Sequence, residues 1–185
     1  MDFNREILWR PSKRHSKDSA LAKYMSWLKE HYSLNFSTYQ DLWEWSTNDL
    51  EQFWETIWLY FDLKSSQSYS KIQGQKKMPG AEWFIDCELN YVEQLLRAKD
   101  ITPHKSAIVS YSETHGKKTL TWSELSQQVS SIADHFKKMG VKKGDRIVAV
   151  LPNTTAALIA FLATASLGAI WSICAPDMGH VAILD

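Results

Sequence analysis

Apolar side chains recur at intervals of three and four along residues 16–61, which is the spacing of one face of an α-helix. The pattern predicts three amphipathic helices, of which the second begins near Thr38 and the third is capped by Asn48 with Glu51. The side chains expected to face inward are Leu21, Tyr24, Met25, Leu28 and Tyr32 in the first helix, Tyr39, Leu42 and Trp43 in the second, and Leu50, Phe53, Trp54, Ile57, Trp58 and Phe61 in the third.

Residues 64–78 are polar and without periodicity, so they predict a surface connection. From Pro79 the chain leads into a helix that carries Tyr91, Val92, Leu95 and Leu96. From residue 107 the apolar runs become short. AIVSY (107–111) and KTLTW (118–122) flank a polar loop and predict a β-hairpin.

Thr121 and Glu124 form a capping box for the next helix, which we expect to end at Gly140. Its expected buried side chains are Leu125, Val129, Ile132, Phe136 and Met139. Two strands, RIVAVL (146–151) and AIWSIC (169–174), then enclose a helix that Thr154 or Thr155 caps and that ends at Gly168. Short connections between strand, helix and strand predict a parallel pair with a right-handed crossover. The fold class is therefore α/β, with a helical N-terminal extension.

Composition excludes several classes of partner. The chain has 21 basic and 21 acidic residues, so no net field favours nucleic acid or an anionic membrane. Cys87 and Cys174 show neither metal-ligand nor disulfide spacing, and the N-terminus lacks a secretory signal, which together indicate the cytoplasm. The uncharged stretch 147–176 is divided by Pro152, Asn153 and Gly168 into strand and helix lengths, so we expect no membrane span.

The segment Asp41–Asp62 combines four tryptophans with carboxylates and has no lysine or arginine. One interpretation is an acidic, aromatic surface that docks a partner. The alternative, which the helical spacing of the aromatics favours, is that they pack the helices together while the carboxylates stay in water.

Ligands of open parallel sheets bind beyond the carboxyl ends of the strands, where Pro152–Thr154 and Ala175–Gly179 lie. The first segment offers an amide, a hydroxyl and a helix N-terminus to an anion, although an ordinary helix cap without a ligand is the favoured explanation. The phosphate-loop, dinucleotide and metalloprotease motifs are absent from the sequence, and the histidines have no metal-ligand spacing. Asp177 has no second carboxylate near it in sequence, so we predict neither catalytic residues nor a metal site.

Several motifs, in this order along nearly the whole chain, resemble the acetoacetyl-CoA synthetases, which belong to the AMP-forming acyl-CoA synthetases of the adenylate-forming superfamily. They are LWRPS (8–12), WEWS (43–46), PGAEWF (79–84), ELNYVEQLL (88–96), TWSEL (121–125), GVKKGDRIVAVLPN (140–153) and GAIWSICAPDMG (168–179). The resemblance implies that residues 1–78 form a helical extension and linker. It implies that residues 79–185 begin the AMP-binding domain with its first hairpin and βαβ unit, leaving the sheet incomplete.

Such enzymes convert a carboxylate and ATP to an acyl-adenylate, from which the CoA thiol displaces AMP. The family's phosphate loop, adenine-binding segment, hinge and C-terminal lysine match nothing in this sequence. We therefore expect an N-terminal part, or the product of a shortened gene, that is inactive alone. ATP, Mg²⁺, CoA and acetoacetate would bind the full-length enzyme, and none of them would bind this part tightly.

One ligand contact is also implied by the resemblance. In related acetyl-CoA synthetases an aromatic–Gly–Gly segment lies against the CoA nucleotide, and the positions matched to it are Trp171, Ser172 and Ile173. Both glycines are lost, which weakens the case for close backbone approach. The alternative is that Trp171 and Ile173 belong to the core of the sheet.

Two other functions stay open at this point. The chain could be a standalone interaction module that recruits a partner through its acidic aromatic helices. It could also be part of another short-chain acyl-CoA synthetase, for acetate or propionate. In addition, apolar surface near Ala157–Leu167 or Ile170, beside a short helix that begins at His180, is expected to be exposed or covered by a second copy of the chain.

Overall fold

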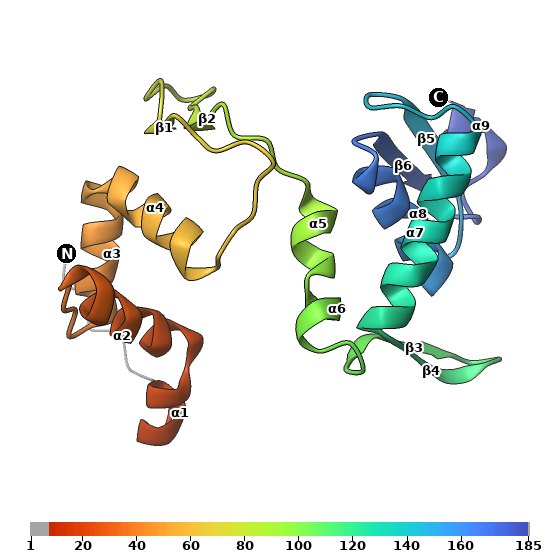
Figure 1. Ribbon diagram of the computed structural model, residues 1–185. Helices are drawn as coiled ribbons and strands as arrows, with labels where there is room; N and C mark the ends of the chain where they lie inside the picture. The colour runs from red at the N-terminus through yellow and green to blue at the C-terminus, as the bar shows by residue number, and fades with distance from the viewer. Residues whose placement is uncertain (1–7, 185) are drawn as a thin grey trace. The chain divides into compact units, whose positions relative to one another are not determined.

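The computed structural model describes residues 8–184 and divides into two compact units (Figure 1). The first comprises Met1–Leu63 with Tyr69–Asp86, and the second comprises Lys64–Ser68 with Cys87–Asp185. The units change over between Asp86 and Cys87, whereas the sequence predicts a domain boundary after Met78. The domain boundary after Met78 stays a prediction.

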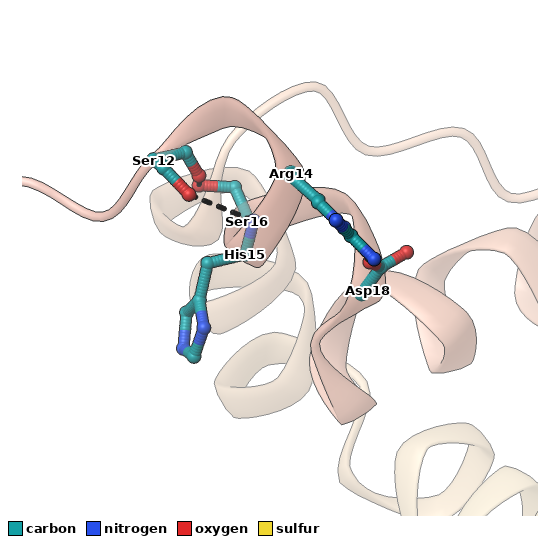
Figure 2. Close-up of polar contacts among 5 residues, drawn as sticks. All are labelled: Ser12, Arg14, His15, Ser16 and Asp18. Atoms are coloured by element: carbon teal, nitrogen blue, oxygen red, sulfur yellow. Dashed lines mark hydrogen bonds and ion pairs between the residues drawn. The ribbon is translucent and has the colours of Figure 1, made fainter.

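Within residues 8–63, the first unit has four helices where the sequence predicts three. They are α1 (Lys13–Asp18), α2 (Ala20–Tyr32), α3 (Tyr39–Asn48) and α4 (Leu50–Tyr60). The additional helix, α1, is a short capped turn (Figure 2): the Ser12 hydroxyl accepts from the His15 N–H at 3.2 Å, and Arg14 pairs with Asp18 at 3.7 Å. The His15 ring points away from that ion pair, and all these side chains are exposed. The contacts shown for α1 are therefore between residues close in sequence.

Helix starts in this unit follow the capping rules, with one correction. Thr38 and Asp41 form a capping box at α3, where the sequence predicts a helix start. The predicted Asn48–Glu51 cap is wrong, because Asn48 is still the last residue of α3. The cap of α4 is Asp49, whose side chain accepts from the Gln52 N–H at 3.1 Å.

The core of the first unit is Tyr24, Leu28 and Leu42, around which Trp45, Phe53 and Ile57 pack. At its centre the Tyr24 hydroxyl and the buried Thr56 hydroxyl lie 2.6 Å apart, and burial raises the pKa of Tyr24. Several side chains predicted to face inward are instead exposed, namely Leu21, Tyr39, Trp43, Leu50, Trp54 and Phe61. The helical period identifies a stripe, but neighbouring elements decide how much of it is covered.

The stretch predicted as an unstructured connection contributes a strand. β1 (Lys71–Gln73) pairs antiparallel with β2 (Trp83–Ile85). α4 covers this small hairpin, with the buried Trp58 ring 4.7 Å from Phe84 and 5.4 Å from Tyr69 between centroids. The hairpin therefore belongs to the first unit.

The second unit has the predicted α/β order. It contains α5 (Tyr91–Leu96), α6 (Ala98–Ile101), β3 (Ser106–Ser112), β4 (Gly116–Thr121), α7 (Trp122–Lys138), β5 (Arg146–Val150), α8 (Thr155–Ser166), β6 (Ile170–Cys174) and α9 (His180–Leu184). β3 and β4 form the predicted antiparallel hairpin, and β5 and β6 form the predicted parallel pair.

The core of this unit lies where α5, α7 and α8 meet. Its buried residues are Val92, Leu125, Val129, Ala133, Ile159, Leu162 and Ala163. Asn90 fastens α5 to α8, because its side-chain amide donates to the Ala165 carbonyl at 3.0 Å. Met139 and Ile132 are predicted to be buried on α7 but are exposed. Met139 follows the last residue of α7 and belongs to the turn that Gly140 completes with φ +90°.

The uncharged stretch 147–176 contains β5, α8 and β6, as its division by Pro152, Asn153 and Gly168 predicts. Among residues 8–184, no helix has the length and apolar character that crossing a bilayer requires.

Candidate functional site

The candidate site begins where β5 and β6 end. Val150 lies opposite Cys174 in the parallel register, and the Leu151 N–H donates to the Cys174 carbonyl at 3.2 Å. The chain therefore leaves both strands at one edge, as the sequence predicts for Pro152–Thr154 and for Ala175–Gly179.

The N-terminus of α8 opens at this edge. Thr154 occupies the N-cap position with extended backbone angles, and its carbonyl accepts from the Ala157 N–H at 3.1 Å. Its hydroxyl makes no capping hydrogen bond, and both Asn153 and Thr154 are exposed. The ordinary helix cap weighed from the sequence is therefore incomplete, which leaves first-turn N–H groups accessible to water or to an anion.

A cavity of about 540 Å³ lies between this helix end and the β3–β4 hairpin. Apolar side chains of Ile108, Leu120 and Ile159 line part of it. Polar groups complete the lining, and they come from Ser110, Ser112, His115, Lys118, Thr119, Gln128, Asn153, Thr154 and Thr155. An apolar floor with a few donors suits a small organic ligand.

The hairpin side of this cavity was not predictable from the sequence. Lys118 and His115 read as polar positions of a hairpin and its loop, and only tertiary packing places them across from Asn153 and Thr154. His115 is exposed, and its Nδ1 lies 2.7 Å from the Thr114 hydroxyl.

The three positions matched to a CoA contact lie inside β6 rather than after it. The Trp171 ring is half-buried, 6.4 Å from the Phe161 ring of α8 between centroids, as the core alternative expects. Ile173 lies on the same face but is 45% exposed, and Ser172 is exposed on the opposite face. None of the three lines the cavity, and CoA contact at these positions stays a prediction.

The opposite face of the β5–β6 pair is open. Val148, Val150 and Ile170 are 64%, 46% and 53% exposed. On α8, Leu158 is 39% exposed, whereas Ile159, Leu162 and Ala163 are buried. The exposed apolar surface expected around α8 and Ile170 is therefore found mainly on the sheet.

Groups with shifted pKa values lie elsewhere. The Thr38 hydroxyl and backbone N–H lower the pKa of Asp41, and the Thr121 N–H and hydroxyl lower that of Glu124. Both carboxylates cap helices. No cluster of histidine, cysteine or carboxylate groups suited to a metal occurs within the described part of the chain.

Two family profiles match consecutive parts of the chain. The acetyl-coenzyme A synthetase N-terminus profile matches residues 39–95, and the AMP-binding enzyme profile matches residues 96–184 directly after it. Residues 96–184 are therefore similar to the AMP-binding enzymes, and residues 39–95 to the N-terminus of acetyl-coenzyme A synthetases.

The similar proteins include acyl-CoA synthetases by name. The chain is 35% identical to rat (Rattus norvegicus) acetoacetyl-CoA synthetase over 97% of its own length and 27% of the relative's. It is 31% identical to malonamoyl-CoA synthetase of Penicillium aethiopicum over 97% of its length and 25% of the relative's. The solved acetoacetyl-CoA synthetase of Streptomyces lividans superposes with a TM-score of 0.92 at 36% identity, over 97% of this chain and 28% of that one. The chain thus spans about a quarter of the length of the relatives it matches, and it corresponds to their N-terminal part.

Proposed function

We propose that this chain supplies the N-terminal part of an enzyme that joins acetoacetate to CoA at the expense of ATP. The observation that carries the proposal is the match to the Streptomyces acetoacetyl-CoA synthetase, which covers 97% of this chain in sequence order and in backbone geometry. In the proposed reaction an acetoacetate oxygen attacks the α-phosphorus of ATP, pyrophosphate leaves, and the CoA thiol then displaces AMP from the acyl-adenylate.

In this proposal the residues of the chain have a structural and ligand-binding role, and they do not transfer protons. The β5–β6 edge, with Asn153 and Thr154, provides accessible donors at the start of α8. We propose that Mg²⁺ accompanies the phosphates of ATP. Catalytic residues are proposed to lie in the parts of the enzyme that this sequence does not match, so the chain alone should be inactive.

CoA contact at Trp171, Ser172 and Ile173 is part of the proposal. Exposure of Ser172 and Ile173 supports it, because both side chains are accessible to a ligand. Burial of Trp171 against Phe161 supports a structural role for that ring. We also place the enzyme in the cytoplasm, in keeping with the two free cysteines.

A second candidate is a synthetase for another short acyl group. The malonamoyl-CoA synthetase of Penicillium aethiopicum matches the same share of this chain, so this part of the sequence is compatible with more than one acyl substrate. We prefer acetoacetate because the solved structure that covers 97% of this chain is named an acetoacetyl-CoA synthetase.

Pyrophosphate exchange into ATP tests the proposal. We expect no acetoacetate-dependent exchange from the 185-residue chain alone and measurable exchange when the remaining part of the Streptomyces enzyme is added as a separate polypeptide. Exchange by the chain alone would overturn its expected inactivity. If the chain and the remaining part of the Streptomyces enzyme are soluble and form a complex that shows no exchange, the proposed function is overturned. Exchange with acetate or propionate in place of acetoacetate would favour the second candidate.

A further inference from the structure

The cavity beside the β3–β4 hairpin continues along the second unit between α7 and α8. It adjoins a second cavity of about 410 Å³, and the two share Gln128, Ala156 and Ile159 as lining residues. Gln128 and Ala156 are exposed, whereas Ile159 is buried. The junction between the two cavities therefore has a buried apolar floor and exposed rims. We call the two cavities together the hairpin groove.

The end of the hairpin groove that lies between the helices is mostly apolar. Its lining residues recur at intervals of three and four on each helix: Gln128, Ser131 and Ile132 on α7, and Ala156, Ile159 and Ala160 on α8. The small side chains of Ser131, Ala156 and Ala160 leave room between the two helices. Ile132 and Leu151 add apolar contact surface. This end of the groove therefore suits a hydrocarbon chain.

The end of the hairpin groove at the hairpin carries positive charge alone. Four lining residues share one face of the hairpin because they are paired in its register, Ile108 with Leu120 and Ser110 with Lys118. Lys118 is exposed and forms no ion pair in the described part of the chain. Among residues 8–184, no aspartate or glutamate lines either cavity. The other titratable lining groups are His115 and Tyr111, and neither is an anion at neutral pH.

We propose that the hairpin groove binds a linear fatty carboxylate, with its head group at Lys118 and Thr154 and its chain over Ile159. The Lys118 ammonium and the Thr154 hydroxyl donate to the carboxylate, since that hydroxyl makes no capping hydrogen bond. Burial of the hydrocarbon between α7 and α8 favours a long chain over a short acid. A cationic head group would meet Lys118 with no carboxylate to balance it. The inference concerns binding to this chain alone and does not depend on the proposed ligase function.

Isothermal titration of the full chain with butanoate, hexanoate, octanoate and decanoate tests the proposal, without ATP or CoA. The Kd should fall roughly two- to fourfold for each methylene that the groove buries, and salt should weaken binding. Octylammonium, which has the same chain and the opposite charge, should bind at least roughly tenfold more weakly than octanoate. Equal binding of the two, or an affinity independent of chain length, would overturn the proposal. An affinity for octanoate that falls as the protein concentration rises would assign the groove to a second copy and would also overturn it.

Variants locate the site and separate binding from folding. Lys118→Met removes the charge but keeps the apolar stem, and it should weaken octanoate binding roughly tenfold. Lys117→Met, at the next position and on the other face of β4, is the matched control and should leave the affinity unchanged. Ala156→Phe narrows the junction and should remove the gain from chains longer than hexanoate. Thermal unfolding should be the same for both lysine variants, and equal loss of octanoate binding in the two would contradict the proposed location.

Discussion

At the scale of single residues, capping contacts begin the helices that frame both units. The Thr121 N–H and hydroxyl each donate to Glu124 Oε2 at 2.8 Å, and the Glu124 N–H donates back to the Thr121 hydroxyl at 3.3 Å. These bonds hold the pKa of Glu124 below its ordinary value of 4.5. The ionised side chain therefore stabilises the fold above that pH, and the contribution is lost as the pH falls through the lowered pKa.

Glu124→Gln tests this contact. The variant should unfold at a slightly lower temperature at neutral pH, because a neutral amide is a weaker acceptor than a carboxylate. The difference from the original chain should shrink on acidification from about pH 5 to about pH 3. Thermal unfolding monitored by circular dichroism across that range is the measurement. Glu113→Gln, in the exposed hairpin loop, is the matched control, and an equal effect there would contradict the capping account.

Residues also show what local sequence can predict. The Thr121–Glu124 box was predictable because it depends only on neighbours in the chain. The Asn48–Glu51 cap failed because Asp49 competes one residue later, while Asn48 completes α3. Tyr39 and Trp43 were expected inside, but Trp45 takes that place, since Phe36 and Phe53 lie within about 6 Å of its ring. The side of a helix that meets a neighbour depends on residues far away in sequence.

At the scale of elements, the parallel pair β5–β6 is covered on one side. Trp171 contacts Phe161 of α8 on that side, whereas Val148, Val150 and Ile170 remain exposed on the other. Parallel strands in proteins are normally covered on both faces. We propose that a second copy of this chain covers the open face when the 185-residue chain is studied by itself, since a formal net charge of zero does not oppose association.

Val148→Lys tests that proposal. A lysine on the open face should cost desolvation in any contact that buries it, so the variant should shift towards monomer. Light scattering at several concentrations should find the original chain associated and the variant less so. Val109→Lys on the β3 strand, where the valine is 47% exposed, is the control and should associate as the original does. A monomeric original chain would refute self-association.

The two-stranded hairpin β1–β2 could not be predicted from the hydrophobic pattern. Each strand has three residues, too few for an alternation of two to stand out, and β1 reads Lys-Ile-Gln. Its existence depends on α4, whose Trp58 supplies apolar cover to Phe84. The β3–β4 hairpin, with longer strands and a polar loop, was predictable by itself.

At the scale of the whole molecule, the order of motifs predicted the similarity to acyl-CoA synthetases, and the hydrophobic pattern predicted the α/β class. The edge formed by Pro152–Thr154 and Ala175–Gly179 was also predictable, because parallel strands present their carboxyl ends together. The cavity between the hairpin and α8 was not, because His115 and Lys118 approach Thr154 only through tertiary packing. The sequence therefore located one wall of the candidate site, and the fold supplied the other.

The central claim is that this chain is equivalent to the N-terminal part of an acetoacetyl-CoA synthetase. A chimera tests it most directly, with this chain replacing the matching 28% of the Streptomyces lividans enzyme. The matching segment of the rat enzyme, grafted in the same way, is the control. The account predicts acetoacetate-dependent exchange of pyrophosphate into ATP by both chimeras. A folded, soluble chimera with this chain that shows no exchange, beside an active control, would contradict it.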